Sequence, residues 1–162
     1  MANSAFITGV GSGAILQVVS TTKTDSFSTT STSMTDITGM SVSITPSSTN
    51  SKIYIIATLN CQNSGDNGGI NLVRDSTAIA QPTSFGSRTA MTAITNRNAN
   101  GTEGETKCLS FLDSPSTTSA TTYKLQMYVR SGTGYVNRSS TDTNSAVYPR
   151  GVSTITVMEV AG

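Results

Sequence analysis

Residues 40–60, MSVSITPSSTNSKIYIIATLN, contain a strand, a stop and a second strand in one continuous unit. Met40, Val42 and Ile44 alternate with serine and threonine, which is the period of a strand with one buried and one solvated face. Pro46 ends this strand because proline has no backbone donor and fixes its own φ. The hydroxyl-rich run after it favours a turn, since short polar side chains bond to their own backbone.

The second strand, from Lys52, carries apolar side chains on both faces. One face has Ile53, Ile55 and Leu59, and the other has Tyr54 and Ile56. Such a strand belongs in the middle of a sheet or sandwich. The unit recurs at residues 106–130, where Pro115 takes the place of Pro46. Because turn signals separate many short strands and no helical period appears, the sequence predicts an all-β antiparallel sandwich, best matched by a jelly roll.

The chain of 162 residues has the size of one domain. We expect residues 14–162 to form the sandwich and residues 1–13 an N-terminal arm. The asparagine- and glycine-rich segment Gln62–Gly69 predicts a hairpin, with Ile70–Asp75 as its return strand. The expected core consists of inward-facing strand positions: Ile53, Ile55, Leu59, Tyr123, Leu125, Met127, Val129, Ile155 and Val157.

Hydroxyl groups replace charges on the surface of this protein. Charged residues make up 12% of the chain and the net charge is +1, whereas ordinary soluble domains are about one quarter charged. Nucleic acids and anionic membranes recruit clustered lysine and arginine, and no such cluster is present. We therefore expect neither as a partner. No secretory signal precedes the first strand and no apolar run has transmembrane length, so export by lysis is expected.

The chain has two cysteines, Cys61 and Cys108, and no histidine. Their spacing is not that of a metal site, and we expect no metal or other cofactor. The favoured interpretation is two small buried apolar residues. One disulfide between neighbouring strands is the alternative, and it would require an oxidising environment.

No catalytic constellation appears. The closest pair of carboxylates, Glu103 and Glu105, lies in a glycine-rich loop that would not desolvate either group. No serine or threonine has a recognisable activating partner. The chain is therefore not expected to be an enzyme.

Two groups of residues are candidates for contacts with other molecules. Phe6, Ile7 and Val10 make the arm apolar, which suggests docking on a neighbouring subunit or capsid protein, although a frayed end is the plain alternative. Tyr135 lies in a short expected strand, and Arg138, Tyr148 and Arg150 lie in the long polar loop that follows it, residues 138–151. Tyrosine and arginine could stack on and hydrogen-bond a sugar, or they could be loop anchors or subunit contacts.

Five strings, in order, resemble a family of tailed-phage virion surface proteins common in marine and cyanobacterial phages. They are residues 13–25 (GAILQVVSTTKTD), 41–53 (SVSITPSSTNSKI), 72–77 (LVRDST), 111–123 (FLDSPSTTSATTY) and 153–160 (STITVMEV). The resemblance implies a virion structural protein with a jelly-roll-like knob, often a homotrimer, at the virion surface after assembly in the host cytoplasm.

Members of this family are often labelled tail fibre or head decoration proteins. Few residues precede the first strand, and there is no coiled-coil heptad or collagen-like repeat to form a stalk. A capsid decoration protein that binds the major capsid protein is therefore the favoured expectation. A tail-fibre or receptor-binding tip that recognises host glycans is the alternative.

Overall fold

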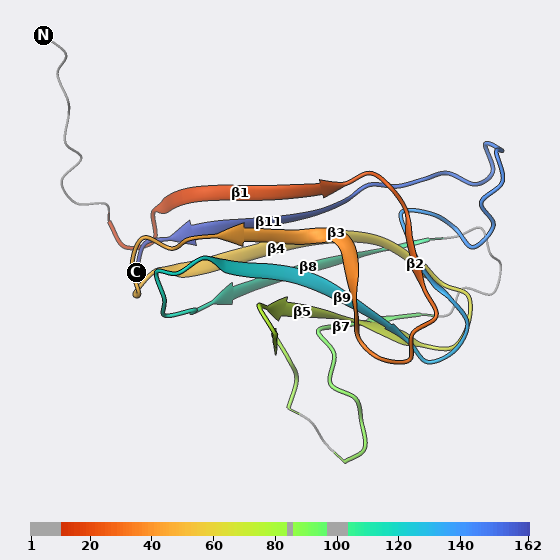
Figure 1. Ribbon diagram of the computed structural model, residues 1–162, viewed down its shortest axis with the longest axis horizontal. Coiled ribbons are helices and arrows are strands. Elements are labelled where there is room, and N and C mark those ends of the chain that lie inside the picture. Colours follow the sequence, from red (N-terminus) through yellow and green to blue (C-terminus); the bar gives the residue numbers. More distant parts are fainter. Residues whose placement is uncertain (1–10, 84–85, 97–103) are drawn as a thin grey trace, which may run out of the picture.

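The computed structural model describes residues 11–83, 86–96 and 104–162, and its strands form two antiparallel sheets packed face to face (Figure 1). The larger sheet contains β1 (Ile15–Lys23), β11 (Ser153–Val160), β4 (Lys52–Asn63), β8 (Glu105–Asp113), β10 (Gly134–Val136) and β2 (Phe27–Thr29). The smaller sheet contains β3 (Thr35–Ile44), β9 (Thr121–Val129), β5 (Gly68–Arg74), β6 (Thr77–Ile79) and β7 (Ala93–Thr95). The expected all-β antiparallel sandwich is confirmed.

The strand order is that of a jelly roll. One sheet runs β1-β11-β4-β8 and the other runs β3-β9-β5-β6, so the chain passes repeatedly between the two sheets. Both proline corners, after β3 and after β8, lie at the end of the sandwich where β1 begins and β11 ends (Figure 1). We call this the corner end. The opposite end, which carries the segment between β10 and β11, is the loop end.

The predicted core is confirmed at every position, because strand alternation places these side chains between the sheets. All nine expected core residues are at most 1% exposed. β4 is the central strand: Ile55 lies opposite Val157 of β11 on one side and Phe111 of β8 on the other. This position explains why β4 is apolar on both faces. One face packs in the core, and the other lies in the middle of the outer surface of the larger sheet.

The segment Gln62–Gly69 is not a hairpin, so that expectation is wrong. It carries the chain from β4 in one sheet to β5 in the other, and β5 pairs with β9, β6 and β7. The tight hairpin lies one strand later, between β5 and β6, where Asp75 adopts a φ of 53°. Aspartate tolerates this left-handed conformation better than most residues. The turn-forming residues therefore predicted correctly that the chain reverses here, but they did not predict which sheet the next strand joins.

β1 departs from simple alternation. Ile15 lies opposite Val160 and Gln17 opposite Glu159, so the register shifts at Leu16. Simple alternation from Ile15 to Val19 would place Ile15 on the same face as Gln17 and Val19. The extra residue of this bulge instead turns Ile15 to the face opposite Gln17. Within the described residues, no helix is long and apolar enough to cross a membrane.

Candidate functional site

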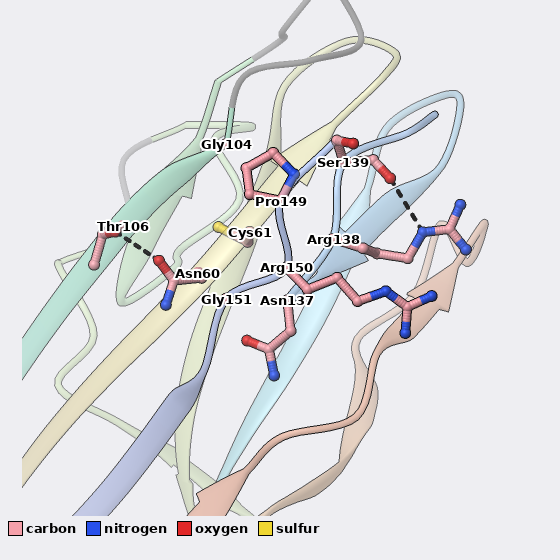
Figure 2. A pocket seen from close by; sticks show the side chains of 10 residues that line it. All are labelled: Asn60, Cys61, Gly104, Thr106, Asn137, Arg138, Ser139, Pro149, Arg150 and Gly151. Atoms are coloured by element: carbon pink, nitrogen blue, oxygen red, sulfur yellow. Dashed lines mark hydrogen bonds between the residues drawn. The ribbon is translucent and has the colours of Figure 1, made fainter. Parts of the chain in front are cut away.

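A cleft opens at the loop end, between strands β4 and β8 and the segments on either side of the loop that precedes β11 (Figure 2). Its cavity volume is about 200 Å³. The lining mixes polar and apolar groups and comes from four parts of the chain: Asn60, Cys61, Gly104, Thr106, Asn137, Arg138, Ser139, Pro149, Arg150 and Gly151.

Asn137 fixes one wall of the cleft. It is buried, and its φ of 59° is one that asparagine tolerates. The side-chain Nδ2 donates to the backbone oxygens of Lys23 at 2.8 Å and Asp25 at 3.0 Å, and Oδ1 accepts from Ser153 Oγ at 2.6 Å. Its backbone N–H donates to Asn60 O at 2.9 Å. Asn137 therefore ties the loop to β1 and β11 through its side chain and to β4 through its backbone.

Asp142 gathers the two arginines of the loop. Arg150 donates from Nε to Asp142 Oδ1 at 3.2 Å and from Nη2 to Oδ2 at 2.7 Å. The Nη1 of Arg138 lies 3.5 Å from the same carboxylate. The guanidinium of Arg138 also lies 4.8 Å from the centre of the Tyr135 ring, within cation–π range. The two cations are thus held side by side and partly neutralised.

Tyr148 belongs to the same region. It is half-buried and, with Arg150 and Asp142, lines a second hollow of about 340 Å³ completed by Thr143, Asn144 and Ser145. The structure therefore brings Tyr135, Arg138, Tyr148 and Arg150 to one end of the molecule. Sequence reasoning missed Asp142, although a lone acidic residue between two loop arginines could have indicated it.

Gln62 is a further residue that sequence reasoning missed. Its buried side chain accepts a hydrogen bond from the backbone N–H of Ser140 at 2.5 Å, and it lies opposite Tyr135 in the β4–β10 pair. The loop after β10 is thereby anchored on β4 as well as on Asn137. Gln62 lies on the face of β4 opposite Cys61, where the loop after β10 covers it, so its place in the strand pattern did not indicate burial.

The chemistry of this end is that of hydrogen bonding and stacking. Asn60 is already engaged, since its Oδ1 accepts from Thr106 Oγ1 at 2.8 Å. Glu105, one of the two carboxylates considered for catalysis, pairs with Lys107 Nζ at 2.7 Å. Glu103 lies outside the described residues, as do Phe6, Ile7 and Val10 of the expected arm. No three metal-ligating side chains gather within the described ranges.

The two thiols differ in their environments. Cys61 faces the core and is buried, whereas Cys108 is on the outer face of β8 and exposed. Both are free, so the disulfide alternative is wrong, and Cys108 is not the buried residue that we expected. Burial, with the Glu105 carboxylate adding to it, raises the pKa of Cys61 to about 12. Opposite faces of a sheet cannot be bridged by one disulfide.

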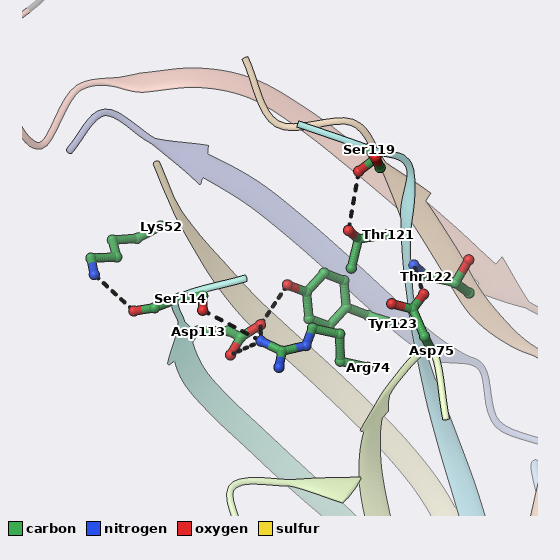
Figure 3. A network of polar contacts seen from close by, with 9 residues as sticks. All are labelled: Lys52, Arg74, Asp75, Asp113, Ser114, Ser119, Thr121, Thr122 and Tyr123. Carbon is green, nitrogen blue, oxygen red and sulfur yellow. Dashed lines mark hydrogen bonds and ion pairs between the residues drawn. The ribbon is translucent and has the colours of Figure 1, made fainter. Parts of the chain in front are cut away.

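A second group of polar and charged side chains gathers at the corner end around one buried carboxylate (Figure 3). Asp113, 7% exposed, accepts from both Arg74 Nη1, at 2.9 and 3.0 Å, and Tyr123 Oη, at 2.7 Å. Burial, with the hydrogen bond to Asp113, raises the pKa of the Tyr123 hydroxyl. Each group has its partners within the protein, so this network connects β5, β8 and β9 rather than offering a reactive site.

Glu159 of β11 is a second buried carboxylate at the corner end. Its Oε1 accepts from the Ser47 backbone N–H at 2.7 Å and from Ser47 Oγ at 2.6 Å, and its Oε2 accepts from Gln17 Nε2 at 2.6 Å. Burial alone would raise its pKa. The hydrogen bonds outweigh burial and lower the pKa to about 2. An ionised Glu159 therefore holds the Pro46 corner against β1 and β11.

No protein-family model matches the sequence, and no curated protein matches it significantly. Solved structures of infectious bursal disease virus are similar in fold. The Gt strain has a TM-score of 0.46 and 13% identity, and the Gx strain 0.46 and 17%, each over 99% of this chain. The VP2 subviral particle gives 0.43 and 15% over 90%. This chain spans 46%, 44% and 38% of those chains, respectively. Likeness at this level identifies neither a family nor a function.

Proposed function

We propose that this chain is a structural protein of a tailed-phage virion, displayed on the virion surface, and that it decorates the capsid. The observation that carries the proposal is the arrangement of the five strings that resemble phage surface proteins. They form β1, β11 and the corner end, including both proline corners and the end of β5. The loops of the loop end lie almost entirely outside them.

This division suggests two roles for the two ends. The corner end and the β1–β11 pair supply the parts shared with virion proteins, and they would face the particle and neighbouring copies. The loop end, with its cleft and its tyrosine–arginine cluster, would point outwards. In this arrangement the apolar residues Phe6, Ile7 and Val10, which precede β1, dock on the major capsid protein or on an adjacent copy. The protein assembles in the host cytoplasm and leaves by lysis.

The experiment is to count and locate the protein in purified virions by gel densitometry and immunogold labelling. Hundreds of copies distributed over the head are expected. A handful of copies at the tail would refute decoration. Head binding should also fall when Phe6, Ile7 and Val10 are all replaced by serine. The matched control replaces three exposed serines, Ser28, Ser41 and Ser43, by alanine and should leave head binding intact.

A receptor-binding tip is the second candidate, and the cluster around Asp142 favours it. Tyr148 and Arg150 are at least partly exposed beside a polar hollow, which suits stacking on and hydrogen bonding to a neutral sugar. If the tip function holds, Tyr148→Ala and Arg150→Ala should each abolish binding to host surface polysaccharide. Lys124→Ala, on the outer face of the smaller sheet, should not. Unchanged binding in all three variants would exclude this cluster as the glycan site.

A further inference from the structure

The outer face of the β1-β11-β4-β8 sheet has an unusual composition. Strand register places its residues in three rows across four strands, and we call the surface they form the neutral face. The rows are Val18–Met158–Tyr54–Leu112, Ser20–Thr156–Ile56–Ser110 and Thr22–Thr154–Thr58–Cys108. Each row holds only apolar, hydroxyl or thiol side chains.

Large apolar side chains on this face are exposed. Val18 at one edge is 56% exposed, Leu112 at the other edge 53%, and Ile56 near the centre 38%. The β1 bulge adds Ile15, which is 59% exposed and lies opposite Val160 at the margin of the same face. Apolar groups gathered on one flat surface are typical of an interface, whereas scattered ones need no explanation.

The twelve positions of the neutral face include no aspartate, glutamate, lysine or arginine. The nearest charged position in register is Lys52, at the margin, where its Nζ donates to Ser114 Oγ. The outer face of the other sheet differs: there Lys124 pairs with Asp36 at 2.7 Å, and Gln126 donates to the same aspartate. A charged partner would leave its charges unmatched against the neutral face. The absence of charge on the neutral face therefore favours a partner whose contacting surface is also uncharged.

A second copy of this chain meets that condition. When symmetry brings a surface against itself, like charges face each other and repel, but a face without charges avoids this cost. Hydroxyl groups both donate and accept hydrogen bonds, so serine and threonine rows can pair with copies of themselves. Two such pairs already form within the sheet, Ser20 with Thr156 at 2.8 Å and Thr58 with Thr154 at 2.7 Å.

We infer that the neutral face is the surface through which two copies of this chain associate about a two-fold axis, since only a two-fold axis brings one face against itself. The inference rests on the proposed assembly role, since it names the surface used for self-association. It does not depend on whether the protein sits on the head or the tail. The corner end and the loop end remain free for other partners in such an assembly.

The test is the mass and dissociation constant of the full chain in solution, by light scattering and sedimentation. The wild type should have twice the 16.8 kDa mass of one chain. Leu112→Asp and Val18→Asp place a carboxylate at opposite edges of the face and should weaken association at least ~100-fold, because the charge would be buried unpaired. Val147→Asp, at a 63% exposed position of the loop end, is the matched control and should associate normally.

A second measurement does not depend on any variant. Cys108 lies on the neutral face, so a bulky maleimide should label it slowly at concentrations where the chain associates and rapidly after dilution to the monomer. A wild type that stays at 16.8 kDa, or aspartate variants that are folded by circular dichroism yet associate as tightly as the wild type, would overturn the inference. Self-association through this face without any virion incorporation would instead refute the proposed function alone.

Discussion

Replacing Glu159 by glutamine tests whether an ionised carboxylate stabilises the corner end. The side chain is 1% exposed and accepts three hydrogen bonds, two from Ser47 and one from Gln17. Glutamine keeps the shape but supplies an NH₂ group in place of one oxygen. That group would face a donor, because Gln17 Nε2 also donates to Thr45 O at 2.8 Å and Ser47 offers its backbone N–H.

The expected cost follows from the pKa. A fall from 4.5 in the unfolded chain to about 2 in the folded protein corresponds to about 3 kcal/mol of stability at neutral pH. Because the folded pKa is the lower one, this contribution is fully present above pH 4.5 and is lost as the pH falls towards 2. Glu159→Gln should therefore lower the free energy of unfolding by about 3 kcal/mol at pH 7 and show a smaller loss of stability in acid.

Urea denaturation at pH 7 and at several values between pH 5 and 2 measures both effects. In a separate thermal denaturation experiment at neutral pH, the melting temperature of the variant should fall by roughly 6–12 °C for a domain of this size. Asp66→Asn, at an exposed position, is the control for loss of one negative charge and should change stability little. Equal stability of Glu159→Gln and the wild type at pH 7, or identical acid profiles, would show that the Glu159 carboxylate does not hold the corner.

Three further outcomes are expected. Tyr123→Phe removes the 2.7 Å hydrogen bond to Asp113 and should cost about 1–2 kcal/mol in urea denaturation; no change would mean that the buried carboxylate does not need this donor. Gly65→Ala places a Cβ against a backbone carbonyl of the facing turn and should cost about 2 kcal/mol or more, unless thermal melting shows that the turn relaxes freely. A maleimide at pH 8 should label at most one thiol per chain, Cys108, because Cys61 is buried with its pKa raised to about 12; two labels would refute its burial.

Strands and core were predictable from the sequence because the relevant signal is local. Alternation of core-facing and outward-facing residues can be recognised without knowing the partner strand, and the alternation with Lys124 and Gln126 placed Tyr123, Leu125 and Met127 correctly in the core. Pro46 and Pro115 likewise mark real corners, since a missing backbone donor ends a strand wherever the chain goes next.

Pairing was less predictable because it depends on distant parts of the chain. The residues of Gln62–Gly69 specify a turn, but whether β5 returns to β4 or crosses to β9 is decided by which sheet can bury its side chains. The bulge at Leu16 is similar: it becomes visible only when β11 supplies the register. Residue types alone predicted neither feature.

The candidate site was predicted in part. Tyrosine and arginine in a loop suggest contact, and the four chosen residues do lie at one end of the sandwich. The acidic centre of the cluster, Asp142, and the anchors Asn137 and Gln62 were missed because their roles depend on backbone groups of β1 and on the segment after β10. A hydrogen bond from a side chain to a backbone atom far away in the sequence cannot be predicted from the residue type.

The pairing of β1 with β11 determines how the molecule carries load. The two strands are antiparallel, and the backbone bonds Gly13 N to Ala161 O and Ala161 N to Ala14 O lie at the corner end, where β1 begins and β11 ends. Force that separates these two points would open the pair one hydrogen bond at a time, as a zipper opens. Force applied to β1 at the corner end and to β11 at the loop end would instead slide the strands past each other and load all of these bonds together. Resistance to pulling should therefore depend on where the protein is held.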